Sequence, residues 1–589
     1  MATRALADRW RLGWLLARHA GRRALHIAGA PLRVLLPGPR GGSPDRLVIA
    51  PQDLRTTDPT VANDIYAGYF AFAGKVVATA GISPFRALAP SEAWSEALMG
   101  FGWLRHLRAA DSALARANAR ALVDDWMTEC GRSQTGPAWD PAVTSRRLMS
   151  WLAQSPLILD GADRAFYRRF LRSIGRQTVW LARALRTLPP SENRLWVAIA
   201  LAYTVVCTGA SAAQIRRIGR TLSEELDRQI LRDGGHVGRN PQTLVDLLTD
   251  LLPLRQAFLS QGHEPPRALV GAIDRMMPAL RLFRHGDGAL ALFNGMSVTP
   301  PDRLATLLAY TDARAQPIEN APYSGYQRLA ARSATVIVDT GPPPPAGYSS
   351  RAHAGCLSFE FSDGPGRIVV NCGAPPPGVD GWRALARSTA AHSTLTVADT
   401  SSCRFLEGDG LGSVLGTPII AGPSDVTMVR EVVRDGDEAG VGVAASHDGY
   451  RSMLGLVHQR RLVLSASGRR LVGTDVIAIV NPSRAQSGSD AYALRFHLHP
   501  LVRATRSSGG LSVRLDLPGG ASWTFTAGGL PIQLEESIFF ATPEGARRTD
   551  QLVVAGGFRT QPQMSWRFER DDAIPPRHAA PDDAGDGPV

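Results

Sequence analysis

The stretch "PIENAPYSGYQRL" (Pro317 to Leu329) separates two parts of the sequence that differ in the period of their hydrophobic pattern. Before it, apolar residues recur at spacings of three and four, as in "MGFGWLRHLRAADSALARANARALVDDWM" (Met99 to Met127), which is typical of amphipathic helices. After it, short runs such as "SATVIVDT" alternate in polarity or are rich in β-branched residues, which is typical of strands. The sequence therefore predicts a multidomain α+β protein.

The predicted domains follow from this change of period. Successive helices joined by short Pro, Gly and Ser connections form antiparallel pairs, and many such pairs close into a bundle or an α/α toroid, expected over residues 46–315. Strands without intervening helices form an antiparallel β-sandwich, expected over residues 316–575. The polar, Pro-rich tail, residues 576–589, is predicted to be disordered.

Residues 1–45 form a basic amphipathic segment in which arginines interrupt every apolar run. The segment lacks the continuous apolar region of a secretory signal and is too broken to span a membrane. Two interpretations stay open, namely contact with an anionic membrane surface and packing on the body of the protein.

The composition is basic, with 65 Lys and Arg against 53 Asp and Glu, a formal net charge of +12, and Lys75 as the single lysine. Guanidinium groups suit carboxylate and sulfate, so an acidic polymer is a reasonable partner. Nucleic acid is not expected, because the sequence has no zinc-finger spacing, aromatic RNA-binding signature or helix-turn-helix pattern. The five scattered cysteines give no disulfide framework.

Two groups of polar residues lie between predicted helices. Asn193 opens an apolar helix in "SENRLW", where it is either a cap or a functional residue. The loop "DGGHVGRNP" (Asp233 to Pro241) places His236 and Arg239 between two glycines and a proline. Loops held by rigid helices often carry binding residues, whereas a plain helix C-cap would explain the glycines alone.

A third group lies in the predicted sandwich. In "RAHAGCLSFEFSDGPGRIVVNCG" (Arg351 to Gly373), a hairpin returns His353 to the neighbourhood of Asn371, and His392 begins another strand in "AAHSTLTV". Two imidazoles with a neighbouring oxygen could hold a divalent metal. The alternative is a pair of histidines hydrogen-bonded within a polar interface.

The order "SENRL", "DGGHVGRNP", "SGYQRL", "AHSTLTV" and "RFHLHP" resembles the heparinase II/III-like polysaccharide lyases, over roughly residues 103–499. The resemblance implies an incomplete helical toroid followed by an antiparallel β-sandwich. It also implies cleavage of a uronic-acid polysaccharide by β-elimination in the cleft between the two domains. Members of that family are typically envelope or periplasmic proteins, whereas this N-terminus gives no clean export signal, so a cytoplasmic location stays open.

The resemblance also implies roles for individual residues. β-Elimination needs a group that neutralises the uronate carboxylate, a base that takes the adjacent proton and an acid for the leaving oxygen. Asn193 and His236 match carboxylate-binding positions, with Arg239 as a bidentate clamp, and Tyr326 in "SGYQRL" is the candidate base and acid. His353 and His392 match histidines that bind a structural Zn²⁺ in some members, with Asn371 as a third neighbour.

Four positions depart from the family pattern: Arg194, Thr243, Arg351 and Asn371 stand where relatives carry His, Tyr, His and Asp. An altered site would rely more heavily on Arg351, Arg239 and Tyr326. The sequence thus leaves two functions: a lyase acting on an acidic polysaccharide, and a catalytically degenerate protein on the same scaffold that binds polysaccharide or takes part in the assembly of envelope polysaccharide.

Overall fold

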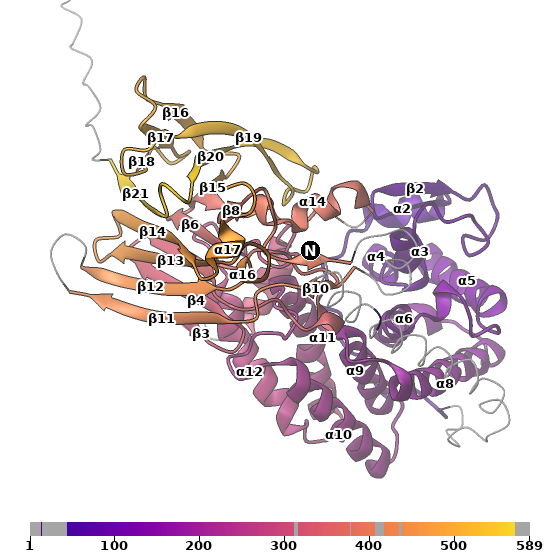
Figure 1. Cartoon of the computed structure of the whole chain (residues 1–589). Helices are drawn as coiled ribbons and strands as arrows, with labels where there is room; N and C mark the ends of the chain where they lie inside the picture. The colour runs from indigo at the N-terminus through magenta and orange to yellow at the C-terminus, as the bar shows by residue number, and fades with distance from the viewer. Residues whose placement is uncertain are drawn as a thin grey trace, which may run out of the picture.

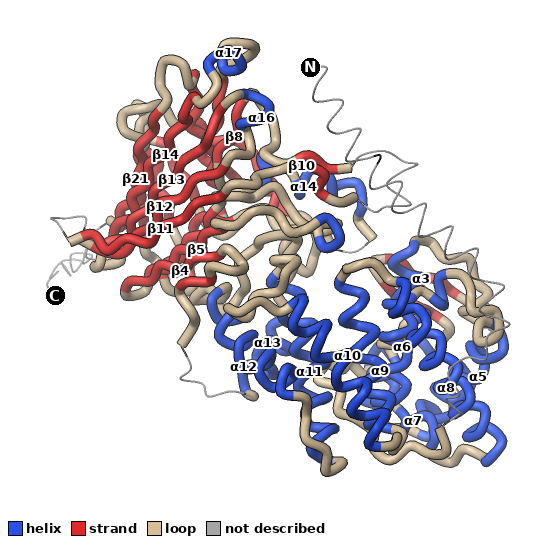
Figure 2. The backbone as a smooth tube through the Cα atoms, turned by 60° about the horizontal axis from the view of Figure 1, so that its bottom comes forward, coloured by secondary structure: helices blue, strands red, loops and turns tan. Residues whose placement is uncertain are grey.

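A computed structural model describes residue 13 and residues 44–310, 316–376, 378–406, 417–434 and 439–571. Most of the predicted N-terminal segment and all of the predicted tail lie outside these residues. Helices fill the first half of the chain and strands the second, and the two halves lie side by side (Figure 1, Figure 2). The predicted fold class, helices followed by antiparallel sheets, is confirmed.

The helical domain is built of amphipathic helices whose starts carry local signals. Asp163 caps the longest of them by accepting a hydrogen bond from the Phe166 amide, and Asn240 caps another just before Pro241. The helices are α2 (Thr60–Tyr66), α3 (Glu92–Met99), α4 (Leu104–Ala110), α5 (Ala113–Glu129), α6 (Pro141–Ala153), α7 (Ser155–Leu159), α8 (Arg164–Thr187), α9 (Glu192–Cys207), α10 (Ala212–Gln229), α11 (Pro241–Ser260), α12 (Arg267–Leu282) and α13 (Pro301–Ala309). A small hairpin, β1 (Tyr69–Phe72) and β2 (Lys75–Ala78), precedes α3.

The first large sheet has nine antiparallel strands and includes the hairpin that the sequence predicted after His353. Its order is β19 (Gln533–Phe539), β20 (Arg547–Gly557), β15 (Ala491–Leu498), β7 (Gly366–Val370), β6 (Phe359–Asp363), β5 (Ala334–Asp339), β4 (Tyr326–Ala331) and β3 (Asn320–Ala321), with β8 (Leu395–Val397) also paired to β15. Because neighbouring chain segments pair throughout most of it, no crossover helix is needed.

The second large sheet has eight strands in the order β11 (Val426–Val433), β12 (Gly440–His447), β13 (Leu456–Ser465), β14 (Arg470–Ile479), β21 (Gln563–Arg570), β18 (Ser522–Thr526), β17 (Ser512–Asp516) and β16 (Arg503–Arg506). A short pair, β9 (Arg404–Phe405) and β10 (Ile419–Ala421), and the short helices α14 (Arg383–Arg387), α16 (Arg451–Leu454) and α17 (Pro482–Ala485) connect the strands.

Two hydrophobic cores hold this arrangement. One fills the sandwich between the sheets, and the other fills the helical domain. Tyr326, Ile337, Val370 and Phe539 of the nine-stranded sheet belong to the helical core. That sheet therefore packs on the helices as well as on its partner sheet, and the boundary between the domains is a buried surface.

In the part of the chain that the structure describes, no helix combines the length and the apolar character needed to cross a membrane.

Candidate functional site at the boundary between the domains

Arg239 ties the helical domain to the sheet domain. Its guanidinium donates to the carbonyl groups of Ser324 (2.7 Å), Gly341 (3.1 Å), Pro342 (2.8 Å) and Gly325 (3.2 Å) and pairs with the Asp339 carboxylate. An arginine has five side-chain N–H donors, and these five bonds use all of them. The geometry therefore favours a structural role over the predicted clamp for a substrate carboxylate.

Tyr326 lies directly beneath this arginine at the start of β4. Its side chain is fully buried; its hydroxyl donates to the Arg239 carbonyl (2.6 Å) and accepts from Nδ2 of Asn294 (2.7 Å). Burial raises the pKa of Tyr326 well above its ordinary value, despite the nearby arginine. A buried phenol with a raised pKa and two bonded partners is poorly suited to the predicted role of base and acid.

Glu192, His236 and Arg351 meet at the same boundary, on the side of the loop that carries Gly238. Gly238 lies between Glu192 and His236, since a side-chain carbon added at this glycine would be 3.0 Å from Oε1 of Glu192 and 3.0 Å from Nδ1 of His236. Arg351 donates a hydrogen bond to Oε2 of Glu192 at 2.6 Å. Burial alone would raise the pKa of Glu192, but the Arg351 charge holds it below its ordinary value. Glu192 was not predicted as a site residue, because its only signal in the sequence is an acidic residue in the first turn of a helix.

The His236 ring is held by two hydrogen bonds. Its Nδ1 accepts from the Gly238 amide (3.0 Å), so the proton of the neutral ring is on Nε2, which faces Oε1 of Gln229 (3.2 Å). Burial lowers the pKa of His236 to about 4, although Glu192 opposes the shift. The imidazole is therefore neutral at pH 7 and offers neither a charge nor a free nitrogen to a substrate carboxylate.

Asn193 is half-buried at the start of α9 and makes no side-chain hydrogen bond with the described residues. The next residue, Arg194, pairs with Glu225 at 2.7 Å and donates to the carbonyls of Leu185 and Leu188. Thr243, where the family carries a tyrosine, is buried, and its hydroxyl has no described hydrogen-bond partner. A threonine hydroxyl lacks the acidity of a phenol, so this position supplies no ready acid or base.

The two histidines predicted as metal ligands do lie together. Nδ1 of His353 is 3.1 Å from Nε2 of His392, whose Nδ1 bonds the Ser388 carbonyl (2.7 Å). Asn371 is directed elsewhere: its Oδ1 accepts from the Ser393 amide (3.0 Å). Among described residues, no three His, Cys, Asp or Glu side chains are grouped as metal ligands. This donor set fits hydrogen-bonded histidines better than a Zn²⁺ site, and the metal stays a prediction.

A second buried contact joins the domains beyond the predicted residues. His285, which follows α12, bonds Glu360 of β6 through Nε2 (3.0 Å) and Ser362 through Nδ1 (2.9 Å). Glu360 also accepts from the Leu292 amide (3.0 Å) and the Asn371 amide (2.9 Å). Buried charged groups persist where they are paired and hydrogen-bonded, so this cluster is a further structural link between helices and sheet.

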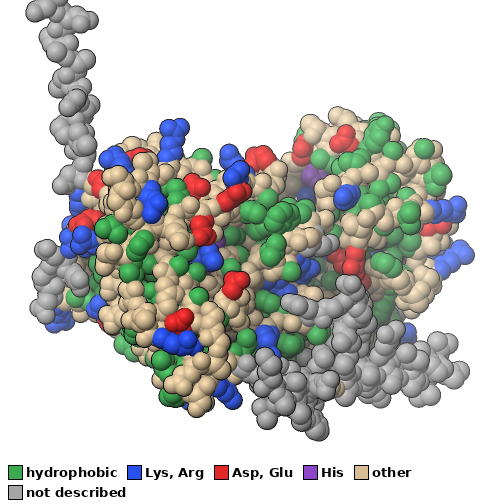
Figure 3. Space-filling view, turned by 45° about the horizontal axis from the view of Figure 1, so that its top comes forward, with side chains coloured by type: hydrophobic (Ala, Val, Ile, Leu, Met, Phe, Trp, Pro, Cys, Tyr) green, Lys and Arg blue, Asp and Glu red, His purple; other side chains and the backbone are tan. Residues whose placement is uncertain are grey.

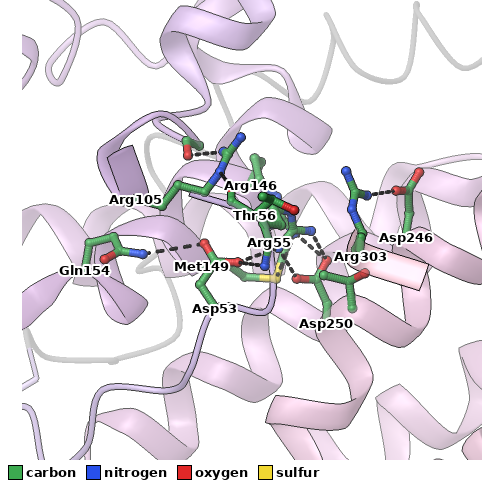
Figure 4. A network of polar contacts seen from close by, with 12 residues as sticks. Asp53, Arg55, Thr56, Arg105, Arg146, Met149, Gln154, Asp246, Asp250 and Arg303 are labelled. Carbon is green, nitrogen blue, oxygen red and sulfur yellow. Dashed lines mark hydrogen bonds and ion pairs between the residues drawn. The ribbon is translucent and has the colours of Figure 1, made fainter. Parts of the chain in front are cut away.

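A polar network also lies inside the helical domain (Figure 4). Asp250 of α11 accepts two parallel bonds from Arg55, both 2.9 Å, and a third from Arg146 at 2.5 Å. Asp53 and Arg105 border the same network. These bonds anchor the segment before α2 to helices α6 and α11. They account for the arginines gathered here, so no ligand is needed to explain them.

Several cavities lie away from the predicted site residues. Three are outlined by described residues, with volumes of about 880, 510 and 10 Å³, and no residue predicted for catalysis or metal binding lines any of them. These three cavities are therefore separate from the predicted site residues.

Comparison with known proteins places the chain in a family. The model described as "Heparinase II/III-like, C-terminal" matches residues 313–567. FtsZ-localized protein C of Caulobacter vibrioides (strain NA1000 / CB15N) is 33% identical over 548 residues, which is 92% of this chain and 92% of that protein.

Solved structures show the same fold at low identity. A heparan sulfate lyase HepC mutant from Pedobacter heparinus has a TM-score of 0.62 at 14% identity, covering 97% of this chain and 90% of its own. A crystal structure of heparinase III has a TM-score of 0.64 at 12% identity, covering 84% and 79%. By its family match and its full-length relative, the chain belongs to the heparinase II/III-like family of polysaccharide-lyase scaffolds.

Proposed function

We propose that this chain is a non-catalytic assembly protein of the dividing cell envelope, built on a polysaccharide-lyase scaffold. The observation that carries the proposal is the state of the predicted catalytic groups. Arg239 has no free donor, Tyr326 is buried with both partners satisfied, and His236 is neutral and bonded at both nitrogens. An elimination site needs a free base and a free cation. Arg239 and Tyr326 instead hold the domains together, and His236 is bonded within the helical domain.

The relative supports a role at the division site. FtsZ-localized protein C carries a name that refers to location with FtsZ and to no enzymatic activity, and it matches this chain over nearly its whole length. We therefore assign this chain to the same kind of setting, at the envelope of a dividing cell. Peripheral contact with a membrane through residues 1–45 belongs to this proposal as well.

The test is sedimentation of the purified full-length chain with assembled FtsZ polymers. The proposal predicts that the chain pellets with polymer and stays in the supernatant when FtsZ is left unassembled. A chain that stays in the supernatant in both cases, and a fluorescent fusion that is uniform along dividing cells, would overturn the division role.

Elimination on an acidic polysaccharide is the second candidate, and one observation favours it. Asn193 has a free amide beside Glu192, whose partner Arg351 has a side chain 52% exposed. These groups offer an amide and a guanidinium to a carboxylate at the domain boundary. The candidate still lacks a base, which is why the assembly role is preferred.

A further inference from the structure

The second of the three cavities lies in the sheet domain, in a part of the molecule that the proposed function does not use. Its wall is formed by the β9–β10 pair, the turn before α16, and the start of α17. Its volume is about 510 Å³, within the range of sites that hold small ligands. Its lining includes Ser402, Ser424, Asp448, Arg451, Asn481 and Arg484.

The charge in this wall is unbalanced. Arginines contribute three positive charges and Asp448 contributes the one negative charge. Arg404 already has an interaction, so the charges available to a ligand are those of the other two arginines. Arg451 is exposed, and its guanidinium forms no hydrogen bond or ion pair with a described residue; Arg484 is exposed and uses Nη1 for the Ser452 carbonyl at 2.9 Å. Both have donors to spare.

Asp448 does not compensate these arginines, because its carboxylate is already committed to a turn. Oδ1 accepts from the amides of Ser424 (2.7 Å) and Asp425 (3.0 Å), and Oδ2 accepts from the Ser424 hydroxyl (2.8 Å). The hydroxyl groups of Ser401 and Ser402 are also engaged, because both form hydrogen bonds with Thr389. The cavity is therefore a prearranged polar pocket with two uncommitted guanidinium groups at its rim.

The overall charge does not explain this arrangement. On the face shown in Figure 3, basic and acidic side chains are interspersed, so the net charge of +12 does not by itself mark a ligand site. A cavity whose uncommitted charges are all of one sign favours an anion of complementary chemistry.

The lining also discriminates between kinds of anion. It contains no Phe, Tyr or Trp, so it offers no flat face on which a sugar ring would stack. Arginine forks suit carboxylates, and the Ser452 hydroxyl and the Asn481 side-chain NH2 group, neither of which has a hydrogen bond to a described residue, suit the peptide groups between acidic side chains. We infer that this pocket binds an acidic peptide segment of a partner protein, with Arg451 and Arg484 holding its carboxylates. The inference is independent of whether the domain boundary is catalytic.

The test is fluorescence anisotropy of a labelled hexaglutamate peptide added to the full-length chain at low salt. We expect binding to wild type and a loss of at least 10-fold in affinity for R451E/R484E, because each charged hydrogen bond that is lost weakens binding by about this factor. R216E/R217E is the matched control. It makes the same charge change on exposed residues of α10, which lies far from α16 and α17 in both views (Figure 1, Figure 2). This control is expected to bind within 2-fold of wild type.

R451A keeps the inference falsifiable if the double variant fails to fold, because the Arg451 side chain has no described bond to lose. It is expected to weaken the peptide by about 10-fold with an unchanged circular dichroism spectrum. Three results would overturn the inference: no binding by wild type, an equal loss in R216E/R217E, or displacement of the peptide by a uronic-acid oligomer that loses affinity in R451A. The last result would assign the pocket to polysaccharide.

Discussion

Replacing Tyr326 by Phe separates a structural tyrosine from a catalytic one. The change removes only the hydroxyl, which bonds the Arg239 carbonyl (2.6 Å) and Nδ2 of Asn294 (2.7 Å) in the buried boundary. The carbonyl then has no described partner, and Asn294 keeps its bond to Asp339 (3.1 Å) but loses the other. A buried polar group without a partner costs about 1–3 kcal/mol, so we expect a loss of roughly 2–4 kcal/mol in the free energy of unfolding.

The assay is urea unfolding followed by tryptophan fluorescence and circular dichroism, with the two probes compared because a two-domain chain need not unfold in one step. The control is Tyr323→Phe, which makes the same chemical change three residues earlier. Tyr323 is 56% exposed, and its hydroxyl has only a 3.4 Å bond from Arg232, so we expect an effect within about 0.5 kcal/mol. If Tyr326→Phe were as mild as this control, the structural account of Tyr326 would be refuted.

Three further predictions follow from other parts of the structure. Asp250→Asn removes the carboxylate that Arg55 and Arg146 share, leaving Arg55 with Asp53 alone, and should lower the free energy of unfolding by about 3 kcal/mol, measured by urea unfolding; an unchanged midpoint would contradict the role of the network. The pKa of His236 is about 4 in the folded chain and about 6.5 when unfolded, so the unfolded state binds more protons between these values. The stability that this group contributes should therefore be complete above pH 6.5 and fall by about 1.4 kcal/mol per pH unit as pH drops toward 4. Thermal melts of His236→Gln should show a weaker dependence of stability on pH in that window, and an equal dependence would contradict the buried, neutral state of His236. Because His353 bonds a second histidine, prolonged dialysis against a chelator should leave the melting temperature unchanged, and a clear fall would restore the metal interpretation.

The sequence was sufficient for the fold because its signals are local. The period of apolar residues changes near Pro317. In the structure, α13 of the helical domain ends at Ala309, and β3, where the nine-stranded sheet begins, starts at Asn320. Caps such as Asn240 and Pro241 are likewise visible in a few adjacent residues. These features depend on backbone preference and on burial of one face, which a single sequence records directly.

The site was predictable only as a set of neighbours. Arg239 and Tyr326 do meet, and so do His353 and His392, as their motifs implied. Their roles depend on partners distant in sequence, because Arg239 bonds residues 85 to 103 positions away. Packing between segments distant in sequence decides whether a guanidinium faces a ligand or five protein acceptors. Such packing leaves no pattern in the local sequence.

The most direct test of the account is the ultraviolet absorbance of full-length protein mixed with a panel of uronic-acid polysaccharides, with divalent metal supplied and a heparinase III preparation as the active control. β-Elimination leaves an unsaturated uronate, which absorbs where the intact polymer does not. We expect a flat trace with every polymer, because the candidate base Tyr326 is buried and its hydroxyl is bonded to two partners. A protein-dependent rise with any polymer, abolished in Asn193→Ala, would contradict the account and establish a lyase.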